Sequence, residues 1–441
     1  MKDIIFQKIF KALKDFNMIE KGDSILIAFS GGPDSVMLLY VLKSLQKKFN
    51  LKLAAYHLNH MLRGEEAKRD EEFSRKLAEE WNIPFYSEKI DIKKYKTEKV
   101  GSLEEKAREI RYKRYHYWKE RLKFRKVALG HTKTDSVETF IYNLIRGSGL
   151  KGLSGIPPVR DFYIRPLIYL EREEIQEFLK IENIPYVIDS TNLEPEFTRN
   201  KIRLQLLPLL EEIRKGATQK IFQSSLILKE AEDFIQCEVK KLLKKATKEV
   251  FKGDWLLDTS LIRSYHLFIK KSLFHYLFGF NFEETSTVLN ILEKGGRIRL
   301  RDFYISSSFG ELYISKKERK LPDTILQKPG IFEFDELNLK IILERGEKTT
   351  HRMLYRINIS WDYLPLIVRS RREGDRVHGK KLKDYFIRKK IPEWRRALIP
   401  VFEHAGEIIW VPGIYLKRGI EGKLKLEVCK IHGEKFWVFD K

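Results

Sequence analysis

The chain has 441 residues, 43% of them hydrophobic, so it is long enough for two or three folded domains and too apolar for wholesale disorder. Lysine and arginine outnumber aspartate and glutamate by 85 to 62, a net charge of +23, which favours a polyanionic partner such as a nucleic acid over a merely lysine-rich composition. The two cysteines are far apart and form no Cys-x-x-Cys motif, which argues against structural zinc and a redox pair. The sequence has no long apolar run, which argues against a secretory signal and a membrane span. These features predict a cytoplasmic protein.

Residues 1–205 alternate between strand-like and helix-like segments. Strands are predicted at 24–29, 52–58, 84–90, 125–130 and 162–167. Helices are predicted at 33–45, 65–81, 102–122, 133–145, 171–182 and 198–210. This alternation predicts an α/β fold with a doubly wound, mostly parallel sheet, in which ligands bind beyond the carboxyl ends of the strands.

The rest of the chain has a different pattern. Long helical segments are predicted at 218–244 and 261–278, and strand signal returns at 297–315. From residue 329 onward, short β-like runs alternate with turns. We therefore predict a catalytic domain at 1–210, a mainly helical domain at 211–320 and a small α+β domain at 321–441.

A glycine-rich loop follows the first strand and consists of Ser30, Gly31, Gly32, Pro33, Asp34 and Ser35. Glycines let the backbone approach an anion closely, and the following helix N-terminus offers unpaired N–H groups. The loop lacks the Walker A pattern, so a P-loop kinase or GTPase is not expected. A plain strand-to-helix turn is the alternative, but SGGPDS resembles the pyrophosphate loop of the ATP pyrophosphatases.

Two further regions carry polar residues near the expected cleft. His57 begins the sequence HLNHMLR at the end of the second predicted strand. One isolated histidine is more often structural than a ligand, but two histidines, an asparagine and an arginine within seven residues favour a functional role. Arg108 and Arg111 share one face of the helix predicted at 102–122, together with Tyr112. A solvated basic stripe would give the same spacing, so both interpretations stay open.

The fourth strand is followed by Gly130, His131, Asp135 and Glu138. The two carboxylates fall within one turn of a helix and can hold Mg²⁺ through oxygen ligands or recognise an ammonium group. Asn192, Arg199 and Arg203 come later, and the two arginines lie one helical turn apart. They suit a phosphate of ATP or of RNA, although a basic surface helix is the alternative.

The order of these motifs carries a specific resemblance. SGGPDS, HLNHMLR, EEKAREIRY, GHTKTDSVET, IRGSGLKGLSG, DSTN and RNKIR are similar to the motifs of the bacterial tRNA(Ile)-lysidine synthetases, a family of the PP-loop ATP pyrophosphatase superfamily. The resemblance continues in the C-terminal segment at Gly374, Asp375 and Arg376 and at Lys380. Only three residues, 377–379, separate Arg376 from Lys380, where family members usually have a longer stretch.

The resemblance implies a reaction. Family members use ATP and Mg²⁺ to adenylate the carbonyl oxygen at position 2 of the wobble cytidine in an isoleucine tRNA with a CAU anticodon. The ε-amine of free L-lysine then attacks that carbon, and AMP and pyrophosphate are released. Lysine must lose a proton before attack, and either Asp135 or His131 is a candidate to accept it.

The resemblance also assigns roles to the candidate residues. Those implied in catalysis are Asp34, His131, Asp135, Arg199 and Arg203, with Asp34 also the metal ligand. Those implied in ATP binding are Ser30, Gly31, Gly32, Pro33, Asp34, Ser35, His57 and Gly130. Those implied in lysine binding are Arg108, Arg111 and Glu138, and those implied in tRNA binding are Asn192, Arg376, Lys380, Lys381 and Lys383.

The C-terminal segment 376–396 holds nine basic and two acidic residues, with Tyr385, Phe386 and Trp394 among them. Basic patches with aromatics suit RNA contacts, and we expect the charges to face tRNA and the aromatics to belong mostly to the core. The alternatives are another adenylating tRNA enzyme such as a thiolase, a small-molecule synthetase of the same superfamily, and an inactive RNA-binding protein. The oligomeric state is left open, and a homodimer is compatible with the sequence.

Overall fold

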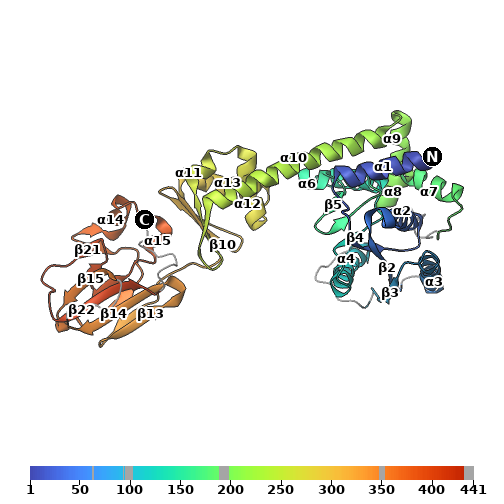
Figure 1. Ribbon diagram of the computed structural model, residues 1–441. Helices are drawn as coiled ribbons and strands as arrows, with labels where there is room; N and C mark the ends of the chain where they lie inside the picture. The colour runs from blue at the N-terminus through green and yellow to red at the C-terminus, as the bar shows by residue number, and fades with distance from the viewer. Residues whose placement is uncertain (62–63, 93, 95–102, 188–197, 347–352, 432–441) are drawn as a thin grey trace. The chain divides into compact units, whose positions relative to one another are not determined.

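The computed structural model describes the chain apart from residues 62–63, 93, 95–102, 188–197, 347–352 and 432–441 (Figure 1). It forms two compact units, Met1–Asp233 and Phe234–Lys441. The boundary between the units falls inside helix α10 (Ala217–Ala246). The domain limits predicted near residues 210 and 320 stay predictions.

A six-stranded sheet forms the centre of the first unit, in the spatial order β3-β2-β1-β4-β6-β5. Its strands are β1 (Ser24–Ala28), β2 (Lys52–Asn59), β3 (Phe85–Lys89), β4 (Lys126–Ala128), β5 (Val159–Arg160) and β6 (Tyr163–Ile164). Every pairing is parallel except that of β5 with β6. The predicted doubly wound, mostly parallel sheet is therefore confirmed.

Alternate side chains of β1 point into two different cores, as the period of a strand requires. Ile25 and Ile27 are fully buried in one cluster, whereas Leu26 is fully buried in another. Helices α1 (Lys2–Asp15), α2 (Pro33–Phe49), α3 (Glu65–Glu80), α5 (Lys133–Ile145) and α7 (Arg172–Ile181) contribute to the first cluster. Helix α4 (Leu103–Arg121) contributes to the second. A strand that is buried on both faces is apolar throughout, which explains the run of four hydrophobic residues in β1.

The segment predicted as one helix at 198–210 is divided in three. It consists of α8 (Thr198–Lys201), a π-helical turn η2 (Ile202–Leu206) and α9 (Leu207–Ile213), which has Pro208 in its first turn. Proline lacks the N–H that would continue the ladder of hydrogen bonds, which accounts for a break at this point. A short helix α6 (Leu150–Leu153) lies in the glycine-rich stretch after α5.

The second unit is richer in strands than the sequence predicts. A five-stranded antiparallel sheet contains β7 (Thr247–Phe251), β8 (Asp254–Asp258), β9 (Gly296–Leu300), β10 (Phe303–Ser308) and β11 (Glu311–Ser315). Its helices are α11 (Thr259–Arg263), α12 (Leu267–Phe278) and α13 (Phe282–Lys294). The single helix predicted at 261–278 is therefore two helices, and the β7–β8 hairpin was not predicted.

The C-terminal segment is an α+β structure, as predicted. One sheet contains β12 (Thr324–Leu326), β16 (Leu366–Arg369), β19 (Val401–His404), β20 (Glu407–Val411) and β21 (Tyr415–Leu416), and another contains β13 (Gly330–Phe334), β14 (Leu339–Arg345), β15 (Met353–Ile359) and β22 (Leu424–Lys430). The smaller elements are β17 (Arg376–Val377), β18 (Lys380–Lys381), α14 (Leu382–Arg388), α15 (Glu393–Arg396) and the 3-10 turns η3 (Asp335–Leu337) and η4 (Trp361–Tyr363). Within the described residues, no helix is both long and apolar enough to cross a membrane.

Candidate active site

The predicted phosphate loop lies at the switch point of the sheet. Strand β1 pairs with β2 on one side and with β4 on the other, so the loop after β1 and the loop after β4 leave the same edge side by side. Ligands of open α/β sheets bind at this point. The sheet therefore brings Ser30 to Ser35 next to the segment that begins at Gly130.

Two glycines have backbone that neighbouring residues approach closely. Gly31 has a φ of +86°, and a Cβ there would lie 2.8 Å from Ser74 Oγ. A Cβ on Gly130 would lie 3.1 Å from the Asp34 carbonyl oxygen, so Gly130 lets the backbone after β4 contact the first turn of α2. Substitution of Gly130 would push the two loops apart, whereas substitution of Gly31 would distort the phosphate loop against helix α3.

The hydroxyl of Ser35 closes the loop from inside. It donates to the Gly32 carbonyl oxygen at 2.9 Å and lies 3.2 Å from both the amide and the hydroxyl of Ser30. Gly32 caps helix α2, and Pro33 occupies its first turn, where the missing N–H of proline costs nothing. The local sequence thus dictates a rigid turn in front of a helix N-terminus.

Three carboxylates and two arginines form the charged centre of the site. Arg172 Nη2 lies 3.0 Å from Asp34 Oδ2 and 3.9 Å from Asp135 Oδ1. Arg203 contacts Asp135 Oδ1 at 3.6 Å and binds Glu138 through two parallel hydrogen bonds, one of them 2.8 Å long. Residues from four separate segments thus converge on one cluster.

Asp135 is fixed by its own helix. It forms a capping box with Thr132, in which Asp135 Oδ2 accepts from the Thr132 amide at 2.8 Å and from its hydroxyl at 2.9 Å. The other oxygen, Oδ1, faces Arg172 and Arg203. One carboxylate oxygen therefore holds the loop, and the other belongs to the charged cluster.

The pKa values of the three carboxylates are shifted in different directions by their surroundings. Burial, followed by the nearby Asp135, raises the pKa of Asp34 to about 6. Burial also raises the pKa of Glu138, although Arg203 opposes this. Burial also acts to raise the pKa of Asp135, but His131, Arg172, the Thr132 amide and Arg203 together lower it below the ordinary value. Separated pKa values among neighbouring acids are typical of functional sites.

His131 contacts a buried arginine. Arg165, 1% exposed, donates from Nε to His131 Nδ1 at 3.2 Å. Its other nitrogens donate to the Pro157 carbonyl oxygen at 2.6 Å and to the Tyr112 hydroxyl at 3.5 Å. Burial, then Arg165, lowers the pKa of His131 to about 3, so this imidazole is neutral at physiological pH.

His57 lies in β2, is 5% exposed, and its Nδ1 is 3.0 Å from the Phe29 carbonyl oxygen. It therefore supports the residue that immediately precedes the phosphate loop. A direct contact of His57 with ATP stays a prediction.

Arginines gather beside α4. Arg108 and Arg160 both stack on the ring of Tyr112, at 5.2 and 5.1 Å from its centroid. Loss of hydration, together with the nearby guanidiniums of Arg199, Arg111 and Arg160, lowers the pKa of Arg108. Such crowding of cations suits an anionic ligand, which is what the predicted lysine-binding pair Arg108 and Arg111 requires for a carboxylate.

The two arginines after residue 198 contact neighbouring turns of α5. Arg203 binds Glu138, and Arg199 lies over the ring of Tyr142 at 5.6 Å. Glu138 and Tyr142 are four residues apart, as are Arg199 and Arg203, so the two helical segments match turn by turn. Asn192 lies outside the described residues.

The predicted tRNA-binding residues of the C-terminal segment lie in and beside a hairpin of the second unit. Arg376, Lys380, Lys381 and Lys383 are all exposed. Strands β17 and β18 are joined by the two residues 378–379, both with positive φ, the geometry of a tight hairpin turn. The short stretch noted in the sequence is therefore a closed turn. The expectation for the aromatics is confirmed, since Phe386 and Trp394 are buried.

The residues present fit a magnesium ion held jointly with phosphates. Asp34 Oδ1 is buried and has no hydrogen-bond partner among the described residues. In that same part of the chain, no three His, Cys, Asp or Glu side chains are grouped to hold a metal by themselves. Mg²⁺ is usually bound by one or two carboxylates together with substrate phosphates, and Asp34 is placed for that role.

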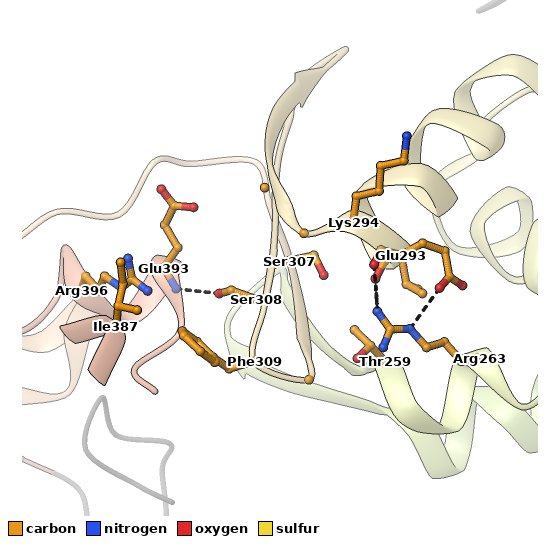
Figure 2. Close-up of a pocket in the computed structure, with 14 residues that line it drawn as sticks. Thr259, Arg263, Glu293, Lys294, Ser307, Ser308, Phe309, Ile387, Glu393 and Arg396 are labelled. Atoms are coloured by element: carbon orange, nitrogen blue, oxygen red, sulfur yellow. Dashed lines mark hydrogen bonds and ion pairs between the residues drawn. The ribbon is translucent and has the colours of Figure 1, made fainter. Parts of the chain in front are cut away.

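A separate cavity of about 470 Å³ lies in the second unit (Figure 2). Thr259, Arg263, Lys294, Phe309 and Arg396 are among the residues that line it. Arg263 is engaged with the Leu292 carbonyl oxygen and with Glu293, and Arg396 Nε donates to the Ile391 carbonyl oxygen. None of the predicted site residues lines this cavity, so it is distinct from the candidate active site.

Sequence reasoning missed Arg172, Arg165 and Arg160. Arg165 is the one charged residue in the apolar stretch 162–170, an isolated polar residue at a strand end that could have been noticed. Arg172 opens helix α7, where the helix dipole disfavours a cation. A residue such as Arg172, which is unfavourable for the helix that contains it, often has a role in contacts outside that helix.

Comparisons with known proteins agree with this geometry. A family described as a PP-loop domain matches residues 1–210, and one described as the TilS substrate C-terminal domain matches residues 366–432. The tRNA(Ile)-lysidine synthase of Caldanaerobacter subterraneus subsp. tengcongensis is 35% identical over 93% of both chains. That of Clostridium tetani is 32% identical over 99% of both chains.

Among solved structures, the U34-tRNA thiolase NcsA from Methanococcus maripaludis matches 51% of this chain and 78% of its own, with a TM-score of 0.43 and 20% identity. A likeness of that size carries no argument about activity, and the thiolase alternative has no support from the full-length relatives. Because these relatives are 32–35% identical over 93–99% of this chain and the two family matches lie at its two ends, this chain belongs to the tRNA(Ile)-lysidine synthase family.

Proposed function

We propose that the enzyme joins free L-lysine to position 2 of the wobble cytidine of an isoleucine tRNA with a CAU anticodon, and that the charged cluster around Asp34 and Asp135 carries the chemistry. The cytosine oxygen attacks the α-phosphorus of ATP, and pyrophosphate leaves with the electrons of the broken P–O bond. The lysine amine then forms the C–N bond while AMP leaves with the electrons of the C–O bond. The cluster of five charged residues at the switch point is the observation that carries this proposal.

The phosphate loop holds the pyrophosphate end of ATP. Backbone amides of Ser30 to Ser35 and the N-terminus of α2 offer the donors that a phosphate needs. Mg²⁺, when bound at Asp34, would neutralise phosphate charge and orient the triphosphate. Arg172 keeps Asp34 in place by binding its Oδ2, which leaves Oδ1 for the metal.

Lysine is recognised by its two charged ends. Arg108 and Arg111 attract its carboxylate, supported by the surrounding arginines. Asp135 Oδ1 and Glu138 attract its ammonium, which would compete with Arg203 for these two carboxylates. Arg199 and Arg203, once displaced from α5, are available to a phosphate of ATP or of the tRNA.

The exposed hairpin of Arg376, Lys380 and Lys381, with Lys383 beside it, contacts the tRNA backbone. We also propose a cytoplasmic location, since ATP, free lysine and tRNA are found there. A homodimer stays a prediction, and light scattering of the purified protein in solution would test it.

The test is an incorporation assay. The protein is mixed with ATP, Mg²⁺, radiolabelled lysine and isoleucine tRNA transcripts that carry a CAU or a UAU anticodon. Label should enter only the CAU transcript, with AMP released, and Asp135→Asn should abolish transfer while the fold is retained. Asp302→Asn, at an exposed position in the second unit, is the matched control and should transfer lysine normally. Label that ignores the anticodon, or sulfur incorporation in place of lysine, would refute the proposal.

A further inference from the structure

The two imidazoles at this edge of the sheet have opposite hydrogen-bond partners. His57 Nδ1 lies 3.0 Å from a carbonyl oxygen, that of Phe29. His131 Nδ1 lies 3.2 Å from the Nε of Arg165. A carbonyl oxygen can only accept a hydrogen bond, and a guanidinium can only donate one. His57 must therefore carry a proton on Nδ1, whereas His131 must have a lone pair there.

A neutral imidazole with a lone pair on Nδ1 carries its proton on Nε2. No hydrogen-bond partner of His131 Nε2 is found among the described residues. We propose that Arg165 is a positioning residue that fixes His131 as this neutral tautomer, so that His131 donates a hydrogen bond from Nε2 to an α-phosphoryl oxygen. This inference rests on the proposed binding of the triphosphate at the neighbouring loop.

The surroundings of Arg165 make this arrangement rigid. Its three nitrogen atoms are directed to His131, the Pro157 carbonyl oxygen and the Tyr112 hydroxyl, and the side chain is 1% exposed. A buried guanidinium with three partners has little freedom to rotate. The orientation of the His131 ring is therefore set by elements on both sides of it, namely α4 and the segment around β5 and β6.

The position of His131 favours a phosphoryl oxygen as the acceptor. Its chain neighbour Gly130 packs against the Asp34 carbonyl in the first turn of α2, so His131 lies beside the phosphate loop. A donor without charge adds no further repulsion next to Arg108, Arg111 and Arg165, whereas an imidazolium would. Of the two bases that the sequence left open for lysine, His131 is therefore the unsuitable one.

The charged and titratable groups that face the ring come from three elements. They are Arg108 and Arg111 on α4, Asp135 on α5 and Arg165 after β6, and Tyr112 on α4 contacts Arg165 in turn. Asp135 favours the protonated ring, and the arginines disfavour it. Burial and the arginines each disfavour the protonated ring, so removal of Arg165 takes away one of these causes and should raise the pH at which His131 titrates, while burial still opposes protonation.

The direct test is nitrogen NMR of the full chain labelled at its ten histidines, with His131→Gln used to assign the signal. In the wild-type enzyme, His131 should show a proton on Nε2, none on Nδ1, and no titration between pH 5 and 8. His57 should carry a proton on Nδ1 in the same spectrum. Arg165→Met should raise the pH at which His131 titrates and let a proton appear on Nδ1, and Arg165→Lys should restore the wild-type pattern. A His131 ring protonated on Nδ1, or one that titrates near pH 6.5 in the wild type, would overturn the inference.

Kinetics give the second test. His131→Ala should lower kcat by about 100-fold or more, the usual effect of removing one such donor. The amide nitrogen of His131→Gln reaches the position of Nε2 and can donate but cannot act as a base, so this variant should recover at least about tenfold of that loss. Equal kcat values for the two variants would contradict the donor role.

Binding of a non-hydrolysable ATP analogue, measured by calorimetry, separates the two possible failures. If the wild-type enzyme does not bind the analogue, or if Gly31→Ala has no effect on its affinity, the proposed function of the loop fails. If the analogue binds at the loop but His131 has the other tautomer, only the present inference fails.

Discussion

Asp34 should make the ligand-free protein less stable at neutral pH than an uncharged residue would. Its carboxylate is 18% exposed and shares the site with Asp135 and Glu138. Burial, followed by Asp135, raises the pKa of Asp34 from 3.8 to about 6, even though Arg172 opposes the shift. Asp34→Asn removes the charge and keeps an oxygen that can accept from Arg172.

The magnitude and the sign follow from the two pKa values. A raised carboxyl pKa means that the native state binds more protons than the unfolded state between pH 3.8 and about 6, so stability falls as the pH rises through this window. Each pH unit is equivalent to about 1.4 kcal/mol, which makes the full cost above pH 6 about 3 kcal/mol. For a unit of this size, about 3 kcal/mol corresponds to a change in Tm of about 6–12 °C.

The assay is scanning calorimetry of the wild-type and Asp34→Asn proteins in EDTA at several pH values from 4 to 8. The Tm of the variant should exceed that of the wild type most clearly at pH 7 and above. The difference should shrink as the pH is lowered through 6 towards 4, where both forms are uncharged. At the same time, Asp34→Asn should lose Mg²⁺-dependent binding of an ATP analogue.

Asp23→Asn is the matched control, because Asp23 is also buried but is satisfied by its partners. Its Oδ2 binds Lys126 Nζ and the Glu20 amide, each at 2.7 Å. Loss of that charge should lower the Tm, with a cost of about 1–3 kcal/mol. The reasoning about Asp34 would be refuted if Asp34→Asn were less stable than the wild type at pH 7.5, or if its effect did not depend on pH.

Three further variants test the active site and the predicted tRNA-binding hairpin. Gly31→Ala should lower the free energy of unfolding by about 1–2 kcal/mol, because the φ of Gly31 is +86° and that conformation is strained for other residues. The variant should also bind an ATP analogue more weakly, because the new Cβ would clash with Ser74. An unchanged affinity would argue against the loop as the phosphate site. Arg172→Met should lower kcat/KM for ATP by about tenfold or more, since an unpaired Asp34 is left behind, and normal kinetics would exclude Arg172 from the site. The double variant Lys380→Ala and Lys381→Ala should bind tRNA more weakly, with an unchanged kcat at saturating tRNA. The slope of the logarithm of the binding constant against the logarithm of the salt concentration should become shallower by about 0.7–0.9 for each phosphate that the protein no longer neutralises.

Much of the first unit follows from its sequence. The five strands and six helices expected within residues 1–210 have counterparts in the structure, and helix α5 has the predicted bounds of 133–145. Apolar strands bounded by turns, and amphipathic helices, each show as a pattern within one contiguous stretch of residues, so they can be recognised from the sequence. The site residues at the strand ends were predictable for the same reason, because parallel strands place their carboxyl ends at one edge.

The second unit shows where local patterns fail. Strands β7 and β8 are five residues long, and β8 pairs with β11, more than fifty residues further along the chain. Short strands of mixed polarity depend on such distant partners for their stability, so the segment between the helices predicted at 218–244 and 261–278 was left without a predicted strand. The break between α11 and α12 likewise depends on a cap, since His266 accepts from the Phe268 amide.

The sequence by itself determined the phosphate loop, the order of the motifs and therefore the family. Each of these features consists of contiguous residues, so their types and spacing along the chain are enough to recognise it. Only the tertiary structure decided which charges meet. Arg172 binds Asp34 across 138 residues, and Arg165 reaches His131 across 34. The protonation of an acid or an imidazole depends on burial and on charges within a few ångströms, and the chain acquires these only when its strands lie side by side.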